Sequence, residues 1–131
     1  MVGLLQAAYA QAGDAIVANG GQIRKYMGDA ILFTVPEAGG AARAARAIAE
    51  SGPYRVAEWE LRFRVGVASG EVAVTTVGHS SLLVEDIIGH TVNRAAQMLE
   101  AAKASPTGVA LDEATERQPG PRREGQGIWT A

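Results

Sequence analysis

The sequence predicts a single α+β domain in which helices pack on one largely antiparallel sheet. Helical and strand-like hydrophobic periodicities alternate along the 131 residues, in the order α-β-β-α-β-β-α-β. Two pairs of neighbouring strands are joined by short turns, as antiparallel hairpins require. The length allows one hydrophobic core, and no internal repeat is visible. We place the domain at residues 1–117 and expect a loose tail at 118–131, which is rich in Pro, Gly and charge.

The first half of the chain is predicted to form a helix, a hairpin and a second helix. An apolar stripe at helical spacing covers residues 4–17 and ends at an Asn-Gly-Gly stop signal. The hairpin has strands near residues 22–26 and 30–35, and its turn contains Gly28-Asp29. A proline and a Gly-Gly pair then interrupt the pattern, and a helix is expected over residues 41–51.

The second half is predicted to contain a second hairpin, a long helix and a short strand. Apolar residues alternate with arginines over residues 61–67, which is typical of a half-buried strand. A strand returning over 72–78 follows a Ser-Gly turn, and then a loop leads to an amphipathic helix over 90–104. A short strand at 108–111 and a brief helical piece at 113–117 complete the predicted elements.

Composition excludes several classes of function. The formal charge is −2 and no basic cluster stands out, so nothing indicates a nucleic-acid surface. There is no cysteine, which excludes disulfides and thiolate metal sites and fits a reducing compartment. No signal peptide is recognisable, and no run reaches the roughly 20 apolar residues that a membrane span needs. We therefore expect a soluble, cytoplasmic domain without a membrane segment.

The hairpin turn offers a candidate metal ligand. Asp29 lies at the tip, outside the ladder of strand hydrogen bonds, where a carboxylate can bind a hard cation such as Mg²⁺. Gly-Asp pairs are also common hairpin punctuation, so a solvated turn aspartate is the alternative interpretation.

The start of the long helix offers a candidate polyphosphate site. Gly89 precedes the helix, and Asn93 lies in its first turns, near free backbone N–H groups and the positive end of the helix dipole. Negative charge is stabilised at such a position. An asparagine there can also serve only as a local hydrogen-bonding residue, and this alternative stays open.

Three motifs occur in a specific order: KxxGDA at residues 25–30, RVGVASGEV at 64–72 and DIIGxTVNxAA at 86–96. In this order and at these separations, they resemble the catalytic domain of the class III nucleotide cyclases, the adenylate and guanylate cyclase family. The resemblance extends from about Leu4 to Thr115 and implies a ferredoxin-like, class III cyclase-type sandwich. The chain departs from the family because the first strand, with its FxDIxGFT-like motif, has no match. The resemblance therefore implies an N-terminally truncated domain whose sheet lacks its middle strand.

The resemblance assigns roles to five residues. Asp29 matches the second metal-binding aspartate, which implies one weakly held Mg²⁺ or Mn²⁺. Lys25 and Asp86 match the two positions that read the purine base, and this pair implies ATP as the ligand. Asn93 matches the asparagine that positions the ribose, and Gln97 stands where the family has an arginine that stabilises the reacting phosphorus. The family's distal lysine on the triphosphate has no evident match.

Two function classes follow from the resemblance. In the first, the chain is an adenylate cyclase-like domain of the family that converts ATP to cyclic AMP and pyrophosphate. In the second, it is a degenerate cyclase-homology module that binds nucleotide or a partner without turnover. The family site is shared across a dimer, which implies a homodimer or a heterodimer with another cyclase domain. Because several catalytic groups are missing, the isolated chain is expected to be weakly active or inactive. A plain interaction domain would not explain why Lys25, Asp29, Asp86 and Asn93 coincide.

Overall fold

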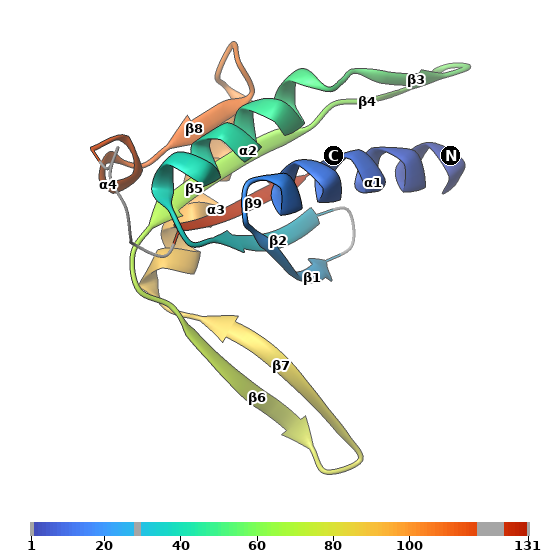
Figure 1. Cartoon of the computed structure of the whole chain (residues 1–131). Helices are drawn as coiled ribbons and strands as arrows, with labels where there is room; N and C mark the ends of the chain where they lie inside the picture. The colour runs from blue at the N-terminus through green and yellow to red at the C-terminus, as the bar shows by residue number, and fades with distance from the viewer. Residues whose placement is uncertain (1, 28–29, 118–124, 131) are drawn as a thin grey trace.

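The computed structural model describes residues 2–27, 30–117 and 125–130 of the chain (Figure 1). The elements are α1 (Val2–Ala18), β1 (Gln22–Met27), β2 (Ala30–Val35), α2 (Ala38–Glu50), β3 (Tyr54–Val56), β4 (Trp59–Leu61), β5 (Arg64–Ser69), β6 (Ala73–His79), β7 (Leu82–Ile88), α3 (His90–Lys103), β8 (Val109–Leu111), α4 (Glu113–Glu116) and β9 (Gly125–Thr130). Five strands form a sheet in the order β1-β2-β9-β5-β8, in which only the β5–β8 pair is parallel. The predicted α+β class is confirmed.

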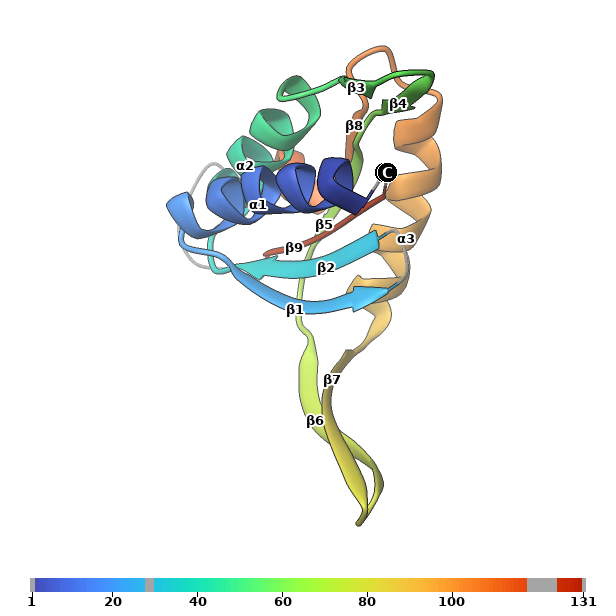
Figure 2. The same cartoon turned by 90° about the vertical axis from the view of Figure 1, so that its right-hand side faces the viewer.

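The five-stranded sheet is covered on both faces. Helices α1 and α2 lie on one face and α3 lies on the other (Figure 2). The larger core cluster joins α1 and α2 to one set of side chains on β2 and β5, including Phe33 and Val67, which are almost fully buried. A smaller cluster joins Leu32 and Ala68 to Ala95 and Leu99 of α3. Because both faces are buried, β2 and β5 have nearly continuous apolar sequences instead of alternating ones.

A two-stranded arm of β6 and β7 projects from the body of the molecule (Figure 1). Of its two strands, only Ile87 is buried, at the base of the arm. We expected β6 but placed a loop where β7 lies. The residues of β7, LLVEDII, do not alternate between apolar and polar, because the strand extends into solvent and has no buried face to encode.

The last part of the expected loose tail, residues 125–130, forms strand β9. Gly125–Thr130 occupies the centre of the sheet, where it pairs antiparallel with β2 on one side and β5 on the other. It thereby takes the position in which the resemblance left a missing strand. Without it, two buried strands would each have an edge of unpaired N–H and C=O groups, which is costly. We did not predict this strand because its sequence is rich in glycine, a residue that is depleted from strands.

Two further differences concern the boundaries of the elements. The strand predicted over 61–67 is divided, since β4 ends at Leu61 and β5 begins at Arg64. Helix α2 begins earlier than predicted and includes the Gly-Gly pair that we interpreted as an interruption. A Cβ at Gly40 would lie 3.0 Å from the carbonyl oxygen of Asn19 and from Val35 Cγ1, so this glycine allows α2 to pack closely.

Candidate functional site

The structure brings together Lys25 and Asp86, the two residues predicted to read a purine base. Lys25 lies on β1 and Asp86 on β7, 61 residues apart in sequence, and Lys25 Nζ donates to Asp86 Oδ1 over 2.9 Å. A neighbouring ion pair of 3.9 Å joins Arg24 to Glu85. The register of β1 against β2 shifts between Ile23 and Lys25, and this irregularity adds Arg24 to the strand. Such bulges re-aim side chains, and here two consecutive cations of β1 both pair with β7.

The ion pair between Lys25 and Asp86 is partly open to solvent and charged. The hydrogen bond from Lys25 holds the pKa of the Asp86 carboxyl below its ordinary value of 3.8, and the backbone N–H of Ile87 adds to this effect. The Ile87 amide donates to the same oxygen, Oδ1, over 2.8 Å. The side chains of Lys25 and Asp86 remain 38% and 27% exposed, so a ligand can reach both.

Asn93 and Gln97, the other two predicted site residues that the structure describes, lie on α3. Both are exposed, and their spacing of four places them on the same side of the helix, one turn apart. The helix begins after Gly89, whose φ of 141° favours glycine, and the backbone N–H groups of Val92 and Asn93 bond to the Gly89 carbonyl. Among the described residues, no hydrogen bond or ion pair links Asn93 or Gln97 to the pair on β1 and β7.

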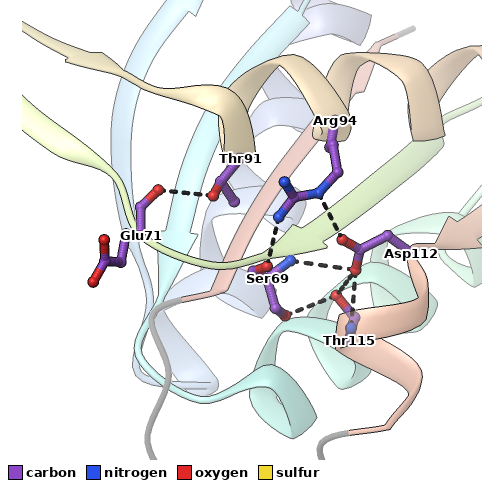
Figure 3. Close-up of polar contacts among 6 residues, drawn as sticks. All are labelled: Ser69, Glu71, Thr91, Arg94, Asp112 and Thr115. Atoms are coloured by element: carbon purple, nitrogen blue, oxygen red, sulfur yellow. Dashed lines mark hydrogen bonds and ion pairs between the residues drawn. The ribbon is translucent and has the colours of Figure 1, made fainter.

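A partly buried polar network fixes the first turns of α3 (Figure 3). The Arg94 guanidinium donates from Nη2 to the Ser69 carbonyl over 2.9 Å and pairs through Nε with Asp112 Oδ2 over 3.2 Å. The Thr91 hydroxyl donates to the Glu71 carbonyl over 2.7 Å. These contacts tie the helix that carries Asn93 and Gln97 to the end of β5 and to the segment that follows it.

Asp112 is the centre of this network. Its side chain is only 8% exposed, and Oδ1 accepts hydrogen bonds from the Thr115 amide, the Thr115 hydroxyl and the Ser69 amide. It is the N-cap of α4, and the buried hydroxyls of Ser69 and Thr115 lie 2.7 Å apart. Sequence reasoning missed this residue. Asp112 stands directly before the short helix that contains Thr115, which was a usable N-cap signal, but nothing in the sequence pointed to Arg94 as the partner of Asp112.

Arg94 is therefore engaged on the side of α3 that faces β5 and α4. The sequence left it as a doubtful substitute for the arginine that the family has at the position of Gln97. With Nη2 on the Ser69 carbonyl and Nε on Asp112, its guanidinium serves the packing of α3. The cation expected near Gln97 is not supplied by this side chain.

The predicted metal ligand, Asp29, lies outside the described residues. Within residues 2–27, 30–117 and 125–130, no group of three or more His, Cys, Asp or Glu side chains could hold a metal ion. The metal prediction therefore depends on Asp29 and on oxygen atoms that a ligand would bring.

Comparison with known proteins gives a fold but no family assignment. No family model and no curated protein matches the sequence. The chain is similar to a solved structure described as a bacterial light-regulated adenylyl cyclase, with a TM-score of 0.78 and 19% sequence identity. The match covers 95% of this chain and 44% of the other, so the chain spans less than half of that structure. At this identity, the likeness establishes a cyclase-like fold. No helix among the described residues is long and apolar enough to cross a membrane.

Proposed function

We propose that this chain is an adenylate cyclase-like domain that binds ATP, from the family that makes cyclic AMP and pyrophosphate. The observation that carries the proposal is the ion pair between Lys25 and Asp86, joined over 2.9 Å from strands far apart in sequence. A lysine donor beside a carboxylate acceptor complements the ring nitrogen and the exocyclic amine of adenine. The similarity to a solved adenylyl cyclase supports the same assignment.

Lys25 and Asp86 can both form hydrogen bonds to a base while their own ion pair is kept. An ammonium group has three N–H donors, and Lys25 uses one of them on Asp86. Both hydrogen bonds that Asp86 accepts from described residues end on Oδ1, which leaves Oδ2 to accept from an exocyclic amine. Guanine presents a carbonyl in place of that amine. It would therefore meet the carboxylate with an acceptor instead of a donor.

The ribose and triphosphate are assigned to the start of α3. Asn93 is exposed in the first turns, where the helix dipole stabilises negative charge. Gln97 can donate a hydrogen bond to a phosphoryl oxygen, but it carries no charge. Replacing a fixed cation by a neutral side chain, where negative charge develops in the transition state, raises the activation free energy by on the order of 3 kcal/mol. Slow turnover is therefore part of the proposal.

A single Mg²⁺ or Mn²⁺ at Asp29 would help to activate the ribose hydroxyl and hold the leaving pyrophosphate. Because Asp29 lies outside the described residues, no step is assigned to the metal. The residues that we do assign act in binding: Lys25 and Asp86 hold the base, and Asn93 orients the sugar. A homodimer, or a heterodimer with another cyclase domain, would bring two such half-sites together in the cytoplasm.

One observation favours a second function, that of a cyclase-homology module that binds nucleotide without turnover. The arginine nearest to Gln97 in the helix, Arg94, is engaged by Asp112 and the Ser69 carbonyl. The two proposals share the same base-binding pair and differ only in turnover.

Base preference tests the part that both proposals share. Fluorescent ATP and GTP analogues would be titrated into the chain and into a variant with Lys25→Glu and Asp86→Cys. We expect the parent chain to prefer ATP and the variant to lose or reverse that preference. A matched control replaces the ion pair on the β3–β4 hairpin, Arg55→Glu with Glu60→Cys, whose atoms are 2.8 Å apart in the parent. Equal affinity of the parent for the two nucleotides would refute the assignment.

A further inference from the structure

We propose that a cavity along the outer strand of the sheet, the edge cavity, binds a small amphipathic anion with an apolar body and one carboxylate head. The edge cavity lies beside β8, between α2 on one face of the sheet and α3 on the other (Figure 2). None of the predicted base-binding, ribose-binding or phosphate-binding residues lines it, so the proposal goes beyond the proposed function. It depends on three observations: the volume and lining of the cavity, a cationic niche beside it, and the short edge of β8.

The edge cavity has the size and the mixed lining of a small-molecule site. Its volume is about 750 Å³, within the range of roughly 300–1,000 Å³ that is typical of ligand pockets. Its apolar lining comes from α2, α3 and β8, and consists of Ala49, Met98, Ala101, Val109, Ala110 and Leu111. An apolar body placed there would be removed from water against side chains of all three elements.

A cationic niche adjoins the edge cavity at the start of β8. The niche has a volume of about 80 Å³, and it shares Ala49 and the loop residues 105–107 with the cavity. Arg62 and Arg64 line the niche, and no described Asp or Glu does. A Cβ at Gly108 would lie 3.5 Å from Arg64 Cδ, so the loop before β8 packs directly against this arginine. The charge of the niche therefore favours a negative group.

Arg64 has N–H donors available for that group. Among the described residues, its guanidinium reaches only the neighbouring Phe63 carbonyl, over 3.5 Å, and forms no ion pair, whereas Arg62 is bonded to Glu60 over 2.9 Å. The Arg64 side chain is partly buried. A guanidinium of this kind can hold a carboxylate through two parallel hydrogen bonds. The hydroxyls of Ser105 and Thr107, 3.0 Å apart, line the same niche.

Two carboxylates in the edge cavity limit the ligand to one anionic head. Glu116 lies on α4, which follows β8, whereas the niche lies at the loop that precedes β8. Glu50 is the last residue of α2 and also lines the cavity. Both would repel a second negative group placed in the apolar part. The favoured ligand therefore has its carboxylate in the niche and an uncharged body in the cavity.

The edge of β8 is poorly suited to the alternative occupant, an added strand. Strand β8 has three residues, and the Val109 amide already donates to the Thr107 hydroxyl over 3.3 Å. Pro106, two residues before the end of the loop, has no N–H to offer to a ladder. Short edges that carry proline resist pairing with another strand. A compact ligand that contacts side chains is therefore the occupant that we propose.

NMR on the unmodified chain with methyl-labelled methionine tests the proposal. Met98 lines the edge cavity, and Met27, at the end of β1, serves as an internal control. The probes are octanoate, 1-octanol and octyltrimethylammonium, which share one alkyl chain and differ in head charge. At neutral pH, octanoate should shift the Met98 signal saturably and bind at least about tenfold more tightly than 1-octanol, because only the carboxylate pairs with Arg64. Octyltrimethylammonium should bind more weakly than 1-octanol, since the niche would repel its positive head.

Two variants separate the contribution of the head from that of the body. Arg64→Gln should weaken octanoate binding about tenfold and leave 1-octanol binding unchanged. Ala101→Phe, which places a bulky side chain in the wall of the cavity, should weaken the binding of both. Arg43→Gln and Ala47→Phe are matched controls at exposed positions of α2 that line neither the cavity nor the niche, and both should leave the two affinities unchanged.

The ligand comparison on the unmodified chain is decisive even where a variant does not fold. The proposal is overturned if octanoate produces no saturable shift of Met98, if octanoate and 1-octanol bind equally, or if octyltrimethylammonium binds most tightly. An unchanged affinity of folded Arg64→Gln for octanoate would also overturn it. If an alternating Val-Thr hexapeptide shifts Met98 and octanoate does not, the edge of β8 accepts a strand and the proposal is wrong.

Discussion

The close approach of the α3 backbone to β5 predicts the effect of one small substitution, Gly66→Ala. Gly66 lies in β5 directly under α3, and an added Cβ would stand 2.1 Å from the backbone nitrogen of Leu99 and 2.5 Å from the carbonyl carbon of Met98. Non-bonded carbon atoms pack best about 3.5–4.0 Å apart, so α3 would have to withdraw by about 1.5 Å. The obstructing atoms are main chain, which cannot move aside as the end of a flexible side chain could.

The expected cost of Gly66→Ala follows from that withdrawal. Overpacking a well-packed interior costs about 1–3 kcal/mol, and a contact with backbone belongs at the upper end. Alanine has less conformational entropy than glycine in the unfolded chain, and this difference offsets about 0.4–1 kcal/mol of the cost. We therefore expect a net loss of about 2 kcal/mol in the free energy of unfolding, a large part of the roughly 5–15 kcal/mol of a typical domain.

Urea denaturation followed by circular dichroism measures this loss, and Gly13→Ala provides a matched control. Gly13 lies in the interior of α1, and a Cβ there meets only Ile23 Cδ1, at an ordinary 3.5 Å. The same substitution should therefore stabilise the chain by up to about 1 kcal/mol, since alanine favours helix. If Gly66→Ala is as stable as the parent while Gly13→Ala behaves as expected, the close packing of α3 on β5 is refuted.

Three further predictions concern charge, assembly and turnover. The Asp86 carboxyl should titrate below 3.8 in a carbon-detected NMR titration, and Lys25→Met should raise its midpoint toward that value. Because the folded-state pKa is lowered, the stability from this pair is complete above pH 3.8 and is lost as the pH falls below it; an unchanged midpoint in the variant would contradict this. Sedimentation equilibrium should reveal a species of at least twice 13.6 kDa, because the β6–β7 arm exposes large apolar side chains such as Leu82, whereas a clean monomer would contradict this. Cyclic AMP production should be very low and greater with Mn²⁺ than with Mg²⁺, and Gln97→Arg alone should restore little; robust synthesis in Mg²⁺ that Asp29→Ala abolishes would refute this.

The part of the site that the sequence could predict is the part that rests on local motifs. Lys25 and Asp86 were assigned to one base-reading pair from their motif positions, and the structure joins them by a hydrogen bond of 2.9 Å. Asn93 and Gln97 were placed on one helix by periodicity, and both lie on α3. Their chemical roles stay predictions. The cluster around Asp112 could not be foreseen as a whole, because it joins α3, β5 and α4 through contacts between residues far apart in sequence.

The fold was predictable where one face of an element is buried and the other is not. The apolar residues of such elements recur with a regular period, and from it α1 and α3 were placed correctly within a few residues. Strand β7 was missed because it is exposed over most of its length, and β9 was missed for a different reason. Its place in the sheet is decided by the unpaired edges of β2 and β5, which are properties of the neighbours and not of its own sequence.

Completing the sheet and supplying the predicted metal ligands are separate requirements in this chain. The resemblance expects the central strand to carry a metal-binding aspartate, but the six residues of β9 include no carboxylate. Thr130 is in register with Ala30, the residue that follows Asp29, so this end of β9 lies beside the strand that leads from the hairpin tip. Strand β9 therefore pairs the inner edges of β2 and β5 through its backbone, and it adds no carboxylate to this end of the sheet.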